Sequence, residues 1–503
     1  MRIATYIAAA ALLFAAAPAS ADVRLPAVFS QHMVVQADTK IPVWGFAAPE
    51  EEVHVSLAGA EATTRADVNG RWRVELPKLK VGGPHELVVQ GKNKLTVGDV
   101  LVGEVWLGSG QSNMAMTVNR CLNYEAEQKA ADLPQLRMFT VRSNATDEPQ
   151  ADCVGEWVVC KPDTVGGFSA TAYFFGREIH KALGQPVGLI NSSVGGTPIE
   201  SWIPAAAQRA EPKLAAFLAA HNQAYTTFDP VKAKASYEKQ VEKWKADVAK
   251  AKAAKKPLPR KPNDPIENRK RKGNVGGLYN GKIAPLVGYA VRGMLWYQGE
   301  ANSTPEKSAY YQVQLPLLVT EWRRAWNQGD FAFAWVQLPN FGGNRPGWLI
   351  VREAMAKSLA VPNTGMAVTT DIGESKDIHP RNKQDVGKRL ALWALAKVYA
   401  RDIAYSGPMF KSATASGDGL VVTFDHVDGL KAGGERLLGF EIAGNDKKWH
   451  PAEARIEGAT VVASSTEVKE PTAVRYNWHE EPIGNLTNAT GLPAGPFRSQ
   501  EWD

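Results

Sequence analysis

Between residues 98 and 405 the chain alternates short apolar runs with helical stretches, and this alternation constrains the fold more than any other feature. Apolar runs typical of buried parallel strands occupy residues 187–190, 291–297, 331–337 and 365–369. Apolar residues at helical spacing indicate helices at residues 171–183 and 384–400. Strand–helix alternation predicts a three-layer α/β domain with a parallel sheet, in which ligands bind at the carboxyl ends of the strands.

Shorter alternating segments flank this α/β region on both sides. Residues 22–97 combine such segments with turns, which predicts an N-terminal β-sandwich domain. Alternation returns at residues 420–424, 440–443, 460–464 and 473–478, which predicts a small C-terminal β domain over residues 406–503. The central domain, residues 98–405, is interrupted by an Ala- and Lys-rich helical insertion at residues 205–272.

The basic character of the chain belongs to one part of this insertion. Residues 231–272 hold fifteen Lys or Arg and five Asp or Glu, a net charge of +10, whereas the whole chain carries +6. Nucleic-acid binding needs aromatic side chains among the basic ones, and only Tyr237 and Trp244 are present here. The pattern therefore predicts a solvated helical hairpin and no nucleic-acid partner.

The N-terminus has the composition of a secretory signal. Arg2 precedes an apolar core at residues 7–17, and Ala19-Ser20-Ala21 forms a small-residue cleavage site. Residues 1–21 are therefore predicted to be a signal peptide cut after Ala21, which exports the mature chain, most simply to the periplasm. No later apolar run is long enough to span a membrane, so no membrane association is expected after cleavage.

The cysteines give little guidance on cross-links or metals. An odd set, Cys121, Cys153 and Cys160, leaves at least one thiol unpaired. Cys153 and Cys160 either bridge a short loop or stay free. No Cys/His cluster has the spacing of a zinc site, so the sequence predicts no metal and no cofactor. It does not decide the oligomeric state.

A glycine-flanked serine follows the first apolar strand of the central region. Residues 100–107 lead into Gly108-Ser109-Gly110-Gln111-Ser112-Asn113-Met114, and the chain beyond Ser112 is able to begin a helix. A serine on such a turn presents its hydroxyl outside the sheet, beside backbone N–H groups that lack intrahelical acceptors. Gly108 and Gly110 supply the backbone freedom that the turn needs. Ser112 is therefore a candidate nucleophile.

Glycines or polar residues also follow three other predicted strands. These are Gly195 and Gly196 after residues 187–191, Gln298, Glu300 and Asn302 after residues 291–297, and Asp377 and His379 after residues 365–369. A glycine pair allows a backbone N–H to point at a bound group, and a side-chain amide can donate to developing negative charge. His379 has an acid two residues before it, which can orient the imidazole as a base. A nearby carboxylate is also expected to raise the pKa of His379.

Taken together, these four strand ends supply the parts of one reaction. Serine alone is a weak nucleophile, and catalysis by serine requires a base, an orienting acid and an oxyanion site. Each of these parts has a candidate at the carboxyl end of a predicted strand, where the sheet places its ligand site. The sequence therefore predicts a serine hydrolase.

Four segments resemble the sequence blocks of the SGNH hydrolase superfamily, and more closely those of the sialate O-acetylesterase family. The segments are Gly110-Gln111-Ser112-Asn113-Met114, Gly195-Gly196-Thr197, Trp296-Tyr297-Gln298-Gly299-Glu300 and Asp377-Ile378-His379-Pro380. The resemblance covers nearly all of the mature chain except the Lys-rich insertion. It implies an SGNH-like three-layer fold and a carboxylic ester hydrolase. The implied substrate is an O-acetylated sugar, either sialic acid or a plant-type polysaccharide or oligosaccharide.

The resemblance also implies the groups that attack the ester and bind the oxyanion. Ser112 resembles the nucleophile, with its own N–H in the oxyanion hole. Gly196 resembles the second donor, with Gly195 as the alternative. The third block implies a further donor, but its asparagine is spaced one residue beyond the superfamily pattern. Gln298 and Asn302 are therefore both candidates, and the position of Gln298 directly after the strand favours it.

The base and its acid are implied by the last block. His379 resembles the base. The superfamily commonly has an aspartate three residues before this histidine, where this chain has Lys376. The acid is therefore Asp377, two residues away, or Asp371 from further off. Three more residues of the blocks are expected to contact the substrate: Gln111, Asn113 and Glu300.

Two other functions remain compatible with these observations. The first is a lipase, thioesterase or arylesterase of the same superfamily, which a comparison of acetyl and octanoyl esters would separate. The second is a carbohydrate-binding protein with an inert serine, which turnover of an acetate ester would exclude. In each carbohydrate-directed reading the expected partner is a small-molecule or polymeric sugar substrate.

Overall fold

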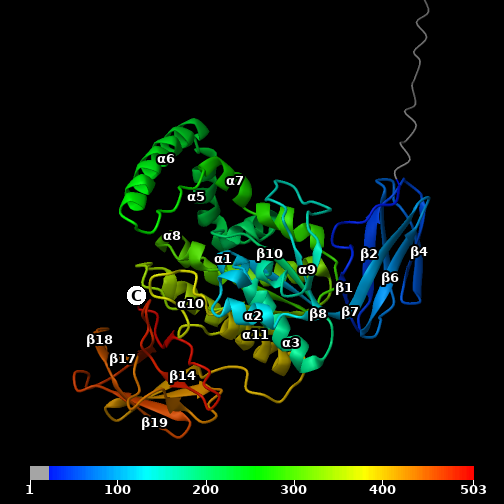
Figure 1. The fold of residues 1–503 in the computed structure, drawn as a ribbon. Helices are drawn as coiled ribbons and strands as arrows, with labels where there is room; N and C mark the ends of the chain where they lie inside the picture. Colours follow the sequence, from blue (N-terminus) through cyan, green and yellow to red (C-terminus); the bar gives the residue numbers. More distant parts are fainter. Residues whose placement is uncertain (1–21, 503) are drawn as a thin grey trace, which may run out of the picture.

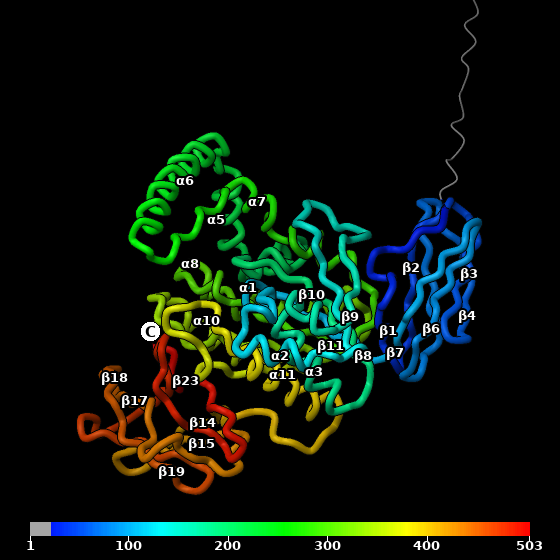
Figure 2. The backbone as a smooth tube through the Cα atoms, viewed as in Figure 1, coloured from blue at the N-terminus to red at the C-terminus, as the bar shows by residue number. Residues whose placement is uncertain are grey.

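The computed structural model describes residues 22–502, and the signal peptide predicted for residues 1–21 lies outside them. Three parts follow one another along the chain (Figures 1 and 2). The N-terminal strands, in blue, and the C-terminal strands, in orange and red, lie on opposite sides of a central part in which helices surround a sheet. The structure is thus a mixed α/β fold with additional β sheets.

The central part contains hydrogen-bonded strands in the order β13-β12-β11-β7-β10-β8-β9. Their bounds are β7 Lys94–Gly110, β8 Leu133–Thr140, β9 Trp157–Cys160, β10 Val187–Ser193, β11 Gly293–Tyr297, β12 Ala332–Val336 and β13 Thr364–Ala367. The strands from β13 to β8 pair in parallel, whereas β9 pairs with β8 antiparallel. The prediction of a parallel sheet is wrong at this edge. An apolar run signals a strand but not its direction, and β9 returns beside β8 without a crossover helix.

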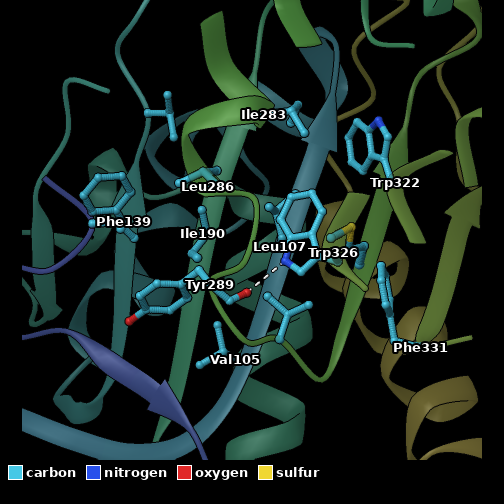
Figure 3. Close-up of a cluster of buried hydrophobic side chains, with 14 of the residues drawn as sticks. Val105, Leu107, Phe139, Ile190, Ile283, Leu286, Tyr289, Trp322, Trp326 and Phe331 are labelled. Carbon is cyan, nitrogen blue, oxygen red and sulfur yellow. Dashed lines mark hydrogen bonds between the residues drawn. The ribbon is translucent and has the colours of Figure 1, made fainter. Parts of the chain in front are cut away.

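Side chains along the central strands alternate between two buried faces. Val105 and Leu107 of β7 pack into one hydrophobic cluster, whereas Trp106 between them packs into another. Figure 3 shows the first cluster, in which the indole of Trp326 donates a hydrogen bond to the carbonyl of Tyr289 (2.9 Å). A strand that is buried on both faces is apolar throughout, which is why these strands lack the alternation of the flanking regions.

Helices cover both faces of this sheet. Helices α9 (Tyr311–Trp326) and α10 (Trp348–Lys357) supply residues to the cluster that holds Leu107. Helices α3 (Ala170–Leu183) and α11 (Lys383–Lys397) supply residues to the cluster that holds Trp106, and they lie where the sequence predicts helices. The shorter helices of this part are α1 (Ser112–Ala115), α2 (Tyr124–Lys129) and α8 (Pro305–Ser308).

Strand β7 belongs to the N-terminal β part as well as to the central sheet. Residues up to 103 pair with β1 and β6, and residues 104–110 pair with β10 and β11. The other strands of the N-terminal part are β1 Val34–Gln36, β2 Ile41–Phe46, β3 Glu52–Leu57, β4 Ala60–Arg65, β5 Arg71–Leu76 and β6 Gly82–Gln90. Strands β2 and β5 form a separate antiparallel pair. The domain boundary predicted between residues 97 and 98 therefore falls inside one continuous strand.

The C-terminal part is antiparallel β structure around a hydrophobic cluster of its own. Its main sheets have the orders β14-β15-β20-β19 and β18-β17-β21-β23. The strands are β14 Met409–Ser416, β15 Gly419–Asp425, β16 Lys431–Ala432, β17 Phe440–Ala443, β18 Trp449–Pro451, β19 Glu453–Glu457, β20 Thr460–Ser464, β21 Ala473–Tyr476, β22 Leu486–Thr487 and β23 Phe497–Arg498.

The Lys-rich insertion is helical. It forms α4 (Ala205–Ala210), α5 (Ala215–Thr226), α6 (Pro230–Ala253) and α7 (Pro265–Lys272). Asp229 and Asp264 cap the N-termini of α6 and α7 by accepting hydrogen bonds from backbone N–H groups. Helix α6 has no buried residue and stands away from the central part in Figure 1, as expected for a solvated helix.

The cysteines are buried thiols in this structure. Cys121, Cys153 and Cys160 are all free, so the optional bridge between Cys153 and Cys160 is not formed. Burial raises the pKa of Cys121 to about 11 and that of Cys153 and Cys160 to about 12. Within residues 22–502 no helix is long and apolar enough to cross a membrane.

Gly110, at the end of β7, is the glycine on which the following turn depends. Its φ is +134°, and a Cβ added to it would lie 2.2 Å from the backbone oxygen of Tyr297. We expect Gly110→Ala to lower the free energy of unfolding by about 3 kcal/mol. Urea unfolding measures this, with Gly167→Ala as the control because an added Cβ there meets nothing within 4 Å. Equal losses in the two variants would contradict the expectation.

Candidate active site

The ends of three neighbouring strands bring the predicted site residues together. The register pairs Gly110 at the end of β7 with Ser193 of β10 and with Tyr297 of β11. Because these parallel strands end at the same edge of the sheet, the loops that follow them begin side by side. One loop carries Ser112, and the other two carry the glycine pair and the amide-rich block of the sequence analysis.

Ser112 is the first residue of α1, directly after the turn. The N–H of Gln111 donates to the carbonyl of Tyr297 (2.9 Å), which fixes the turn to β11. Gly195 lies against the serine, since a Cβ built on Gly195 would be 3.4 Å from the Cβ of Ser112. The backbone N–H groups of Ser112 and Gly196 donate to no acceptor among residues 22–502. Both are therefore available to a ligand beside the hydroxyl.

His379 lies in the loop between β13 and α11, and its Nε2 is 2.9 Å from the Oγ of Ser112. Its Nδ1 is 3.4 Å from the Oδ1 of Asp377, which also accepts a hydrogen bond from the backbone N–H of His379 (2.9 Å). Asp371, the alternative acid, instead pairs with both terminal nitrogens of Arg389 (2.6 and 2.7 Å). The structure therefore brings Asp377 to the imidazole and commits Asp371 elsewhere.

The surroundings of His379 lower its pKa below the ordinary value of 6.5. Burial of the imidazole has the largest effect, and Asp377 opposes it. Three cations lower the pKa further: Lys383, Arg120 and Arg260. Asp377 therefore raises the pKa of His379 as expected, but burial and the cations outweigh it, so the expected net rise is wrong. The side chain of Asp377 is 55% exposed, so water screens its charge.

Asn113 ties the two halves of the site together. Its Nδ2 donates to the carbonyl of Ile378 (3.0 Å) and to the Oε1 of Glu300 (2.5 Å), and its Oδ1 accepts from the Nζ of Lys383 (2.7 Å). Burial raises the pKa of Glu300 and lowers that of Lys383 to about 8. Because Asn113 and Ile378 adjoin the serine and the histidine, their bond joins the loop of Ser112 to the loop of His379.

Gln298 and Asn302 are fully buried and bond to protein groups. The Nε2 of Gln298 donates to the carbonyl of Thr197 (3.1 Å) and to the Oδ1 of Asn302 (2.7 Å). The Nδ2 of Asn302 donates to the Oε2 of Glu200 (3.0 Å). These bonds hold the loop of Thr197 next to the serine. Neither amide is among the groups that line the cavity described next.

A cavity of about 400 Å³ opens where these loops meet. From the predicted set it is lined by Gln111, Ser112, Gly195, Gly196, Glu300 and His379, whereas Asn113 lies behind it. Four cations that the sequence analysis does not single out also line it: Arg260, Arg271, Lys272 and Arg345. For Arg260, Arg271 and Lys272 the one sequence signal is the proline-containing stretch before α7, which ends α6 and allows the chain to reverse direction. Their charge pattern predicts a solvated surface instead.

The described residues hold no group of His, Cys, Asp and Glu that could bind a metal ion. The positions that the site does place together belong to the loops after β7, β10, β11 and β13. The chemistry available there is that of a hydroxyl, an imidazole, free backbone N–H groups and a cationic wall.

Comparison with known proteins agrees with this geometry. A family described as carbohydrate esterase, sialic acid-specific acetylesterase, matches residues 102–254 and 277–396. The crystal structure of a carbohydrate acetylesterase from Xanthomonas citri superposes with a TM-score of 0.81 at 36% sequence identity, over 95% of this chain and 100% of that one. Sialate O-acetylesterases from Rattus norvegicus and Homo sapiens are 28% and 26% identical, over 95% and 97% of this chain and 94% of each relative.

The fold, the site and these matches define the chain as a carboxylic ester hydrolase. It belongs to the carbohydrate esterase family of sialic acid-specific acetylesterases. The resemblance stated from the sequence blocks is therefore confirmed. Residues 255–276 fall between the two matched stretches, and they include three of the four cations of the cavity wall.

The buried amide network makes a stability prediction. Gln298→Ala leaves the Asn302 Oδ1 and the carbonyl of Thr197 without one donor each, so we expect a loss of about 1–3 kcal/mol in the free energy of unfolding. Gln223→Ala, at an exposed position of α5, is the control. The measurement is chemical denaturation of both variants. Equal denaturation midpoints for Gln298→Ala and Gln223→Ala would contradict a stabilising role of the amide network.

Proposed function

We propose that the chain removes O-acetyl groups from sugars with Ser112 as nucleophile and His379 as general base. The observation that carries this proposal is the 2.9 Å contact between the Ser112 Oγ and the His379 Nε2 at the wall of the cavity. A serine hydroxyl becomes an effective nucleophile when a neutral imidazole accepts its proton. The family and the Xanthomonas citri carbohydrate acetylesterase support an acetylated carbohydrate as the substrate.

The reaction proceeds through an acetyl-enzyme. The Ser112 Oγ attacks the acetyl carbonyl carbon while the His379 Nε2 takes the hydroxyl proton. The tetrahedral intermediate collapses, the bond to the sugar oxygen breaks, and the imidazolium gives its proton to that oxygen. Water then attacks the acetyl-enzyme, with His379 again accepting a proton, and acetate leaves as the Ser112 hydroxyl is restored. Asp377 orients the imidazole and stabilises its cation.

The oxyanion hole is assigned to the backbone N–H groups of Ser112 and Gly196. Both are unpaired within the described chain, both residues line the cavity, and Gly195, the neighbour of Gly196, lies against Ser112. The amides of Gln298 and Asn302 already donate to protein oxygens, so these two side chains act as positioning residues. Backbone donors held by such a network need no reorganisation when negative charge develops. Gln111 and Glu300, which line the cavity, remain assigned to substrate contact.

A polar cavity favours a sugar ester over a long acyl chain. Besides Ser112 and His379, its wall consists of cations, amides, the Glu300 carboxyl and backbone, and Ile378 is its one large aliphatic residue in the described chain. A lipase or long-chain thioesterase needs an apolar surface for the acyl tail. The paired serine and imidazole in turn argue against a purely carbohydrate-binding protein.

The finer architecture and the location belong to the same proposal. Helices on both faces of the sheet and a nucleophile directly after β7 support an SGNH-like three-layer domain over residues 98–405. Residues 22–97 and 406–503 are proposed as flanking β domains that help to hold an oligosaccharide. Export to the periplasm is proposed from the composition of residues 1–21 alone.

The assignment of Ser112 as nucleophile predicts the effect of removing its hydroxyl oxygen. Ser112→Ala is expected to lower kcat on 4-nitrophenyl acetate by at least about 10³-fold and to leave the melting temperature nearly unchanged. Ser193→Ala is the control, since Ser193 ends the neighbouring strand and its hydroxyl bonds to Asn191 (2.7 Å). A Ser112→Ala enzyme that keeps a tenth of the activity would refute the role.

The assignment of the base predicts the acid limb of the pH profile. His379 must be neutral to accept the serine proton, and its pKa is lowered. As the pH decreases, kcat/KM is therefore expected to fall with a midpoint below pH 6.5. Because Asp377 raises this pKa, Asp377→Asn is expected to move the midpoint to still lower pH. A wild-type midpoint above 6.5, or an upward shift in the variant, would show that other groups control the limb.

A further inference from the structure

The peptide between Gly195 and Gly196 lacks the hydrogen bonds that hold the rest of the loop after β10. The N–H of Val194 donates to the last carbonyl of β7 (3.0 Å), and the carbonyl of Thr197 accepts from the Nε2 of Gln298 (3.1 Å). These bonds fix the loop on both sides of the glycine pair. Between them, the N–H of Gly196 donates to no acceptor within the described chain.

The two glycines leave this peptide free to turn over. A peptide plane flips when the ψ of the residue before it and the φ of the residue after it change together, and a Cβ on either residue restricts this change. Gly196 has a φ of +68°, and the peptide that joins it to Gly195 is trans. The C=O and N–H of a trans peptide point in opposite directions. Its orientation therefore decides whether this peptide presents a donor or an acceptor beside Ser112.

Arg271 of α7 holds the peptide in one of these orientations. One terminal nitrogen of its guanidinium donates to the carbonyl of Gly195 (3.2 Å), and the other donates to the Oδ1 of Asn268 (2.9 Å). Within the described chain, Arg271 is the one residue that donates to the carbonyl of Gly195. Because this carbonyl is held by Arg271, the N–H of Gly196 points away from the guanidinium. A hydrogen bond from a charged donor is stronger than one between neutral groups.

Helix α7 is itself anchored at both ends. At its start, the Oδ1 of Asp264 accepts from two backbone N–H groups of the first turn (2.9 and 3.2 Å). Near its end, the guanidinium of Arg269 lies 3.4 Å from the ring of Tyr225 and donates to the carbonyl of Tyr225 (2.6 Å). Beyond the helix, the N–H of Gly276 donates to the carbonyl of Glu200 (3.0 Å), a few residues after the glycine pair. The helix that carries Arg271 is thus fixed to the loop that Arg271 contacts.

We propose that Arg271 is a positioning residue of the oxyanion hole, which keeps the N–H of the Gly195–Gly196 peptide directed at the negative charge that develops beside Ser112. The proposal rests on the function proposed above, in which the N–H of Gly196 is the second donor. A donor stabilises an oxyanion best when its direction is fixed before the charge appears. The glycine pair lies within the family match and Arg271 lies outside it, so the insertion supports a part of the site that belongs to the family.

The kinetic test uses phenyl acetate, whose one polar group is the ester itself. Arg271→Met is expected to lower kcat by about ten- to hundredfold and to leave KM within about threefold of wild type. KM stays because the oxyanion exists in the transition state and not in the bound ester. Lys270→Met is the matched control, since Lys270 on the same helix is exposed and pairs with Glu267 (2.9 Å).

A second measurement reports on the oxyanion directly. 2,2,2-Trifluoroacetophenone accepts the Ser112 oxygen at its carbonyl carbon, and the resulting hemiketal carries its negative oxygen in the oxyanion hole. Its inhibition constant is expected to rise in Arg271→Met by about the factor by which kcat falls. Acetanilide binds without forming an oxyanion, so its inhibition constant is expected to stay within about threefold of wild type.

A further variant separates the hydrogen bond of Arg271 from the positive charge of the cavity wall. Lys272→Met removes a charge from the same wall, and the Lys272 ammonium makes no hydrogen bond or ion pair within the described chain. Because no bond to the glycine pair is lost, the loss of kcat is expected to be smaller than in Arg271→Met.

Three results would overturn the inference while the proposed function stands. The first is a kcat of Arg271→Met within about threefold of wild type. The second is an equal loss of kcat in Lys272→Met, which would assign the effect to charge. The third is a loss carried by KM and by acetanilide, which would make Arg271 a substrate contact. The proposed function fails separately, if Ser112→Ala remains active on phenyl acetate.

Discussion

Strand β7 is the constraint on which the rest of the structure depends. Residues up to 103 complete the N-terminal β part, and residues 104–110 form the middle of the central sheet. A strand that is hydrogen-bonded over its whole length leaves no hinge between the two parts. Its end at Gly110 takes a φ of +134°, which lets the chain turn against Tyr297 and sets the place of Ser112. The position of the nucleophile is thus a property of the sheet.

Polar groups around the serine form an inner set that holds positions and an outer set that faces the cavity. In the inner set, Lys383 and Glu300 both bond to Asn113, and Glu200 bonds to Asn302 and to Lys307. Buried charges cost free energy unless they are hydrogen-bonded, so this set tolerates few alternative arrangements. The outer set has the opposite character, because its cations (Arg260, Arg271, Lys272 and Arg345) form no ion pair with a carboxylate of residues 22–502.

Sequence patterns predict what depends on local periodicity and strand ends. Five central strands (β7, β10, β11, β12 and β13), helices α3 and α11, and the approach of Ser112 to His379 all follow from such patterns. Strands β8 and β9 are absent from the predicted set, and the antiparallel direction of β9 does not follow from the sequence because a short apolar run carries no direction. The position of Lys272 at the cavity also does not follow from the sequence. A run of charged residues predicts a solvated surface unless the path of the chain after α6 is known. The lowered pKa of His379 depends on burial, which spacing does not report.

The hydrogen bond from Asn113 to the carbonyl of Ile378 joins residues that lie 265 positions apart in the chain. Closing so long a loop has an entropic cost that the bond alone does not offset, so folding of the intervening chain must bring its ends together. A polypeptide that ends before Ile378 has the Asn113 amide but lacks the carbonyl to which this amide donates, and it also lacks the imidazole of His379. The approach of Ser112 to His379 thus depends on the whole intervening chain of the central part and on no local segment of it.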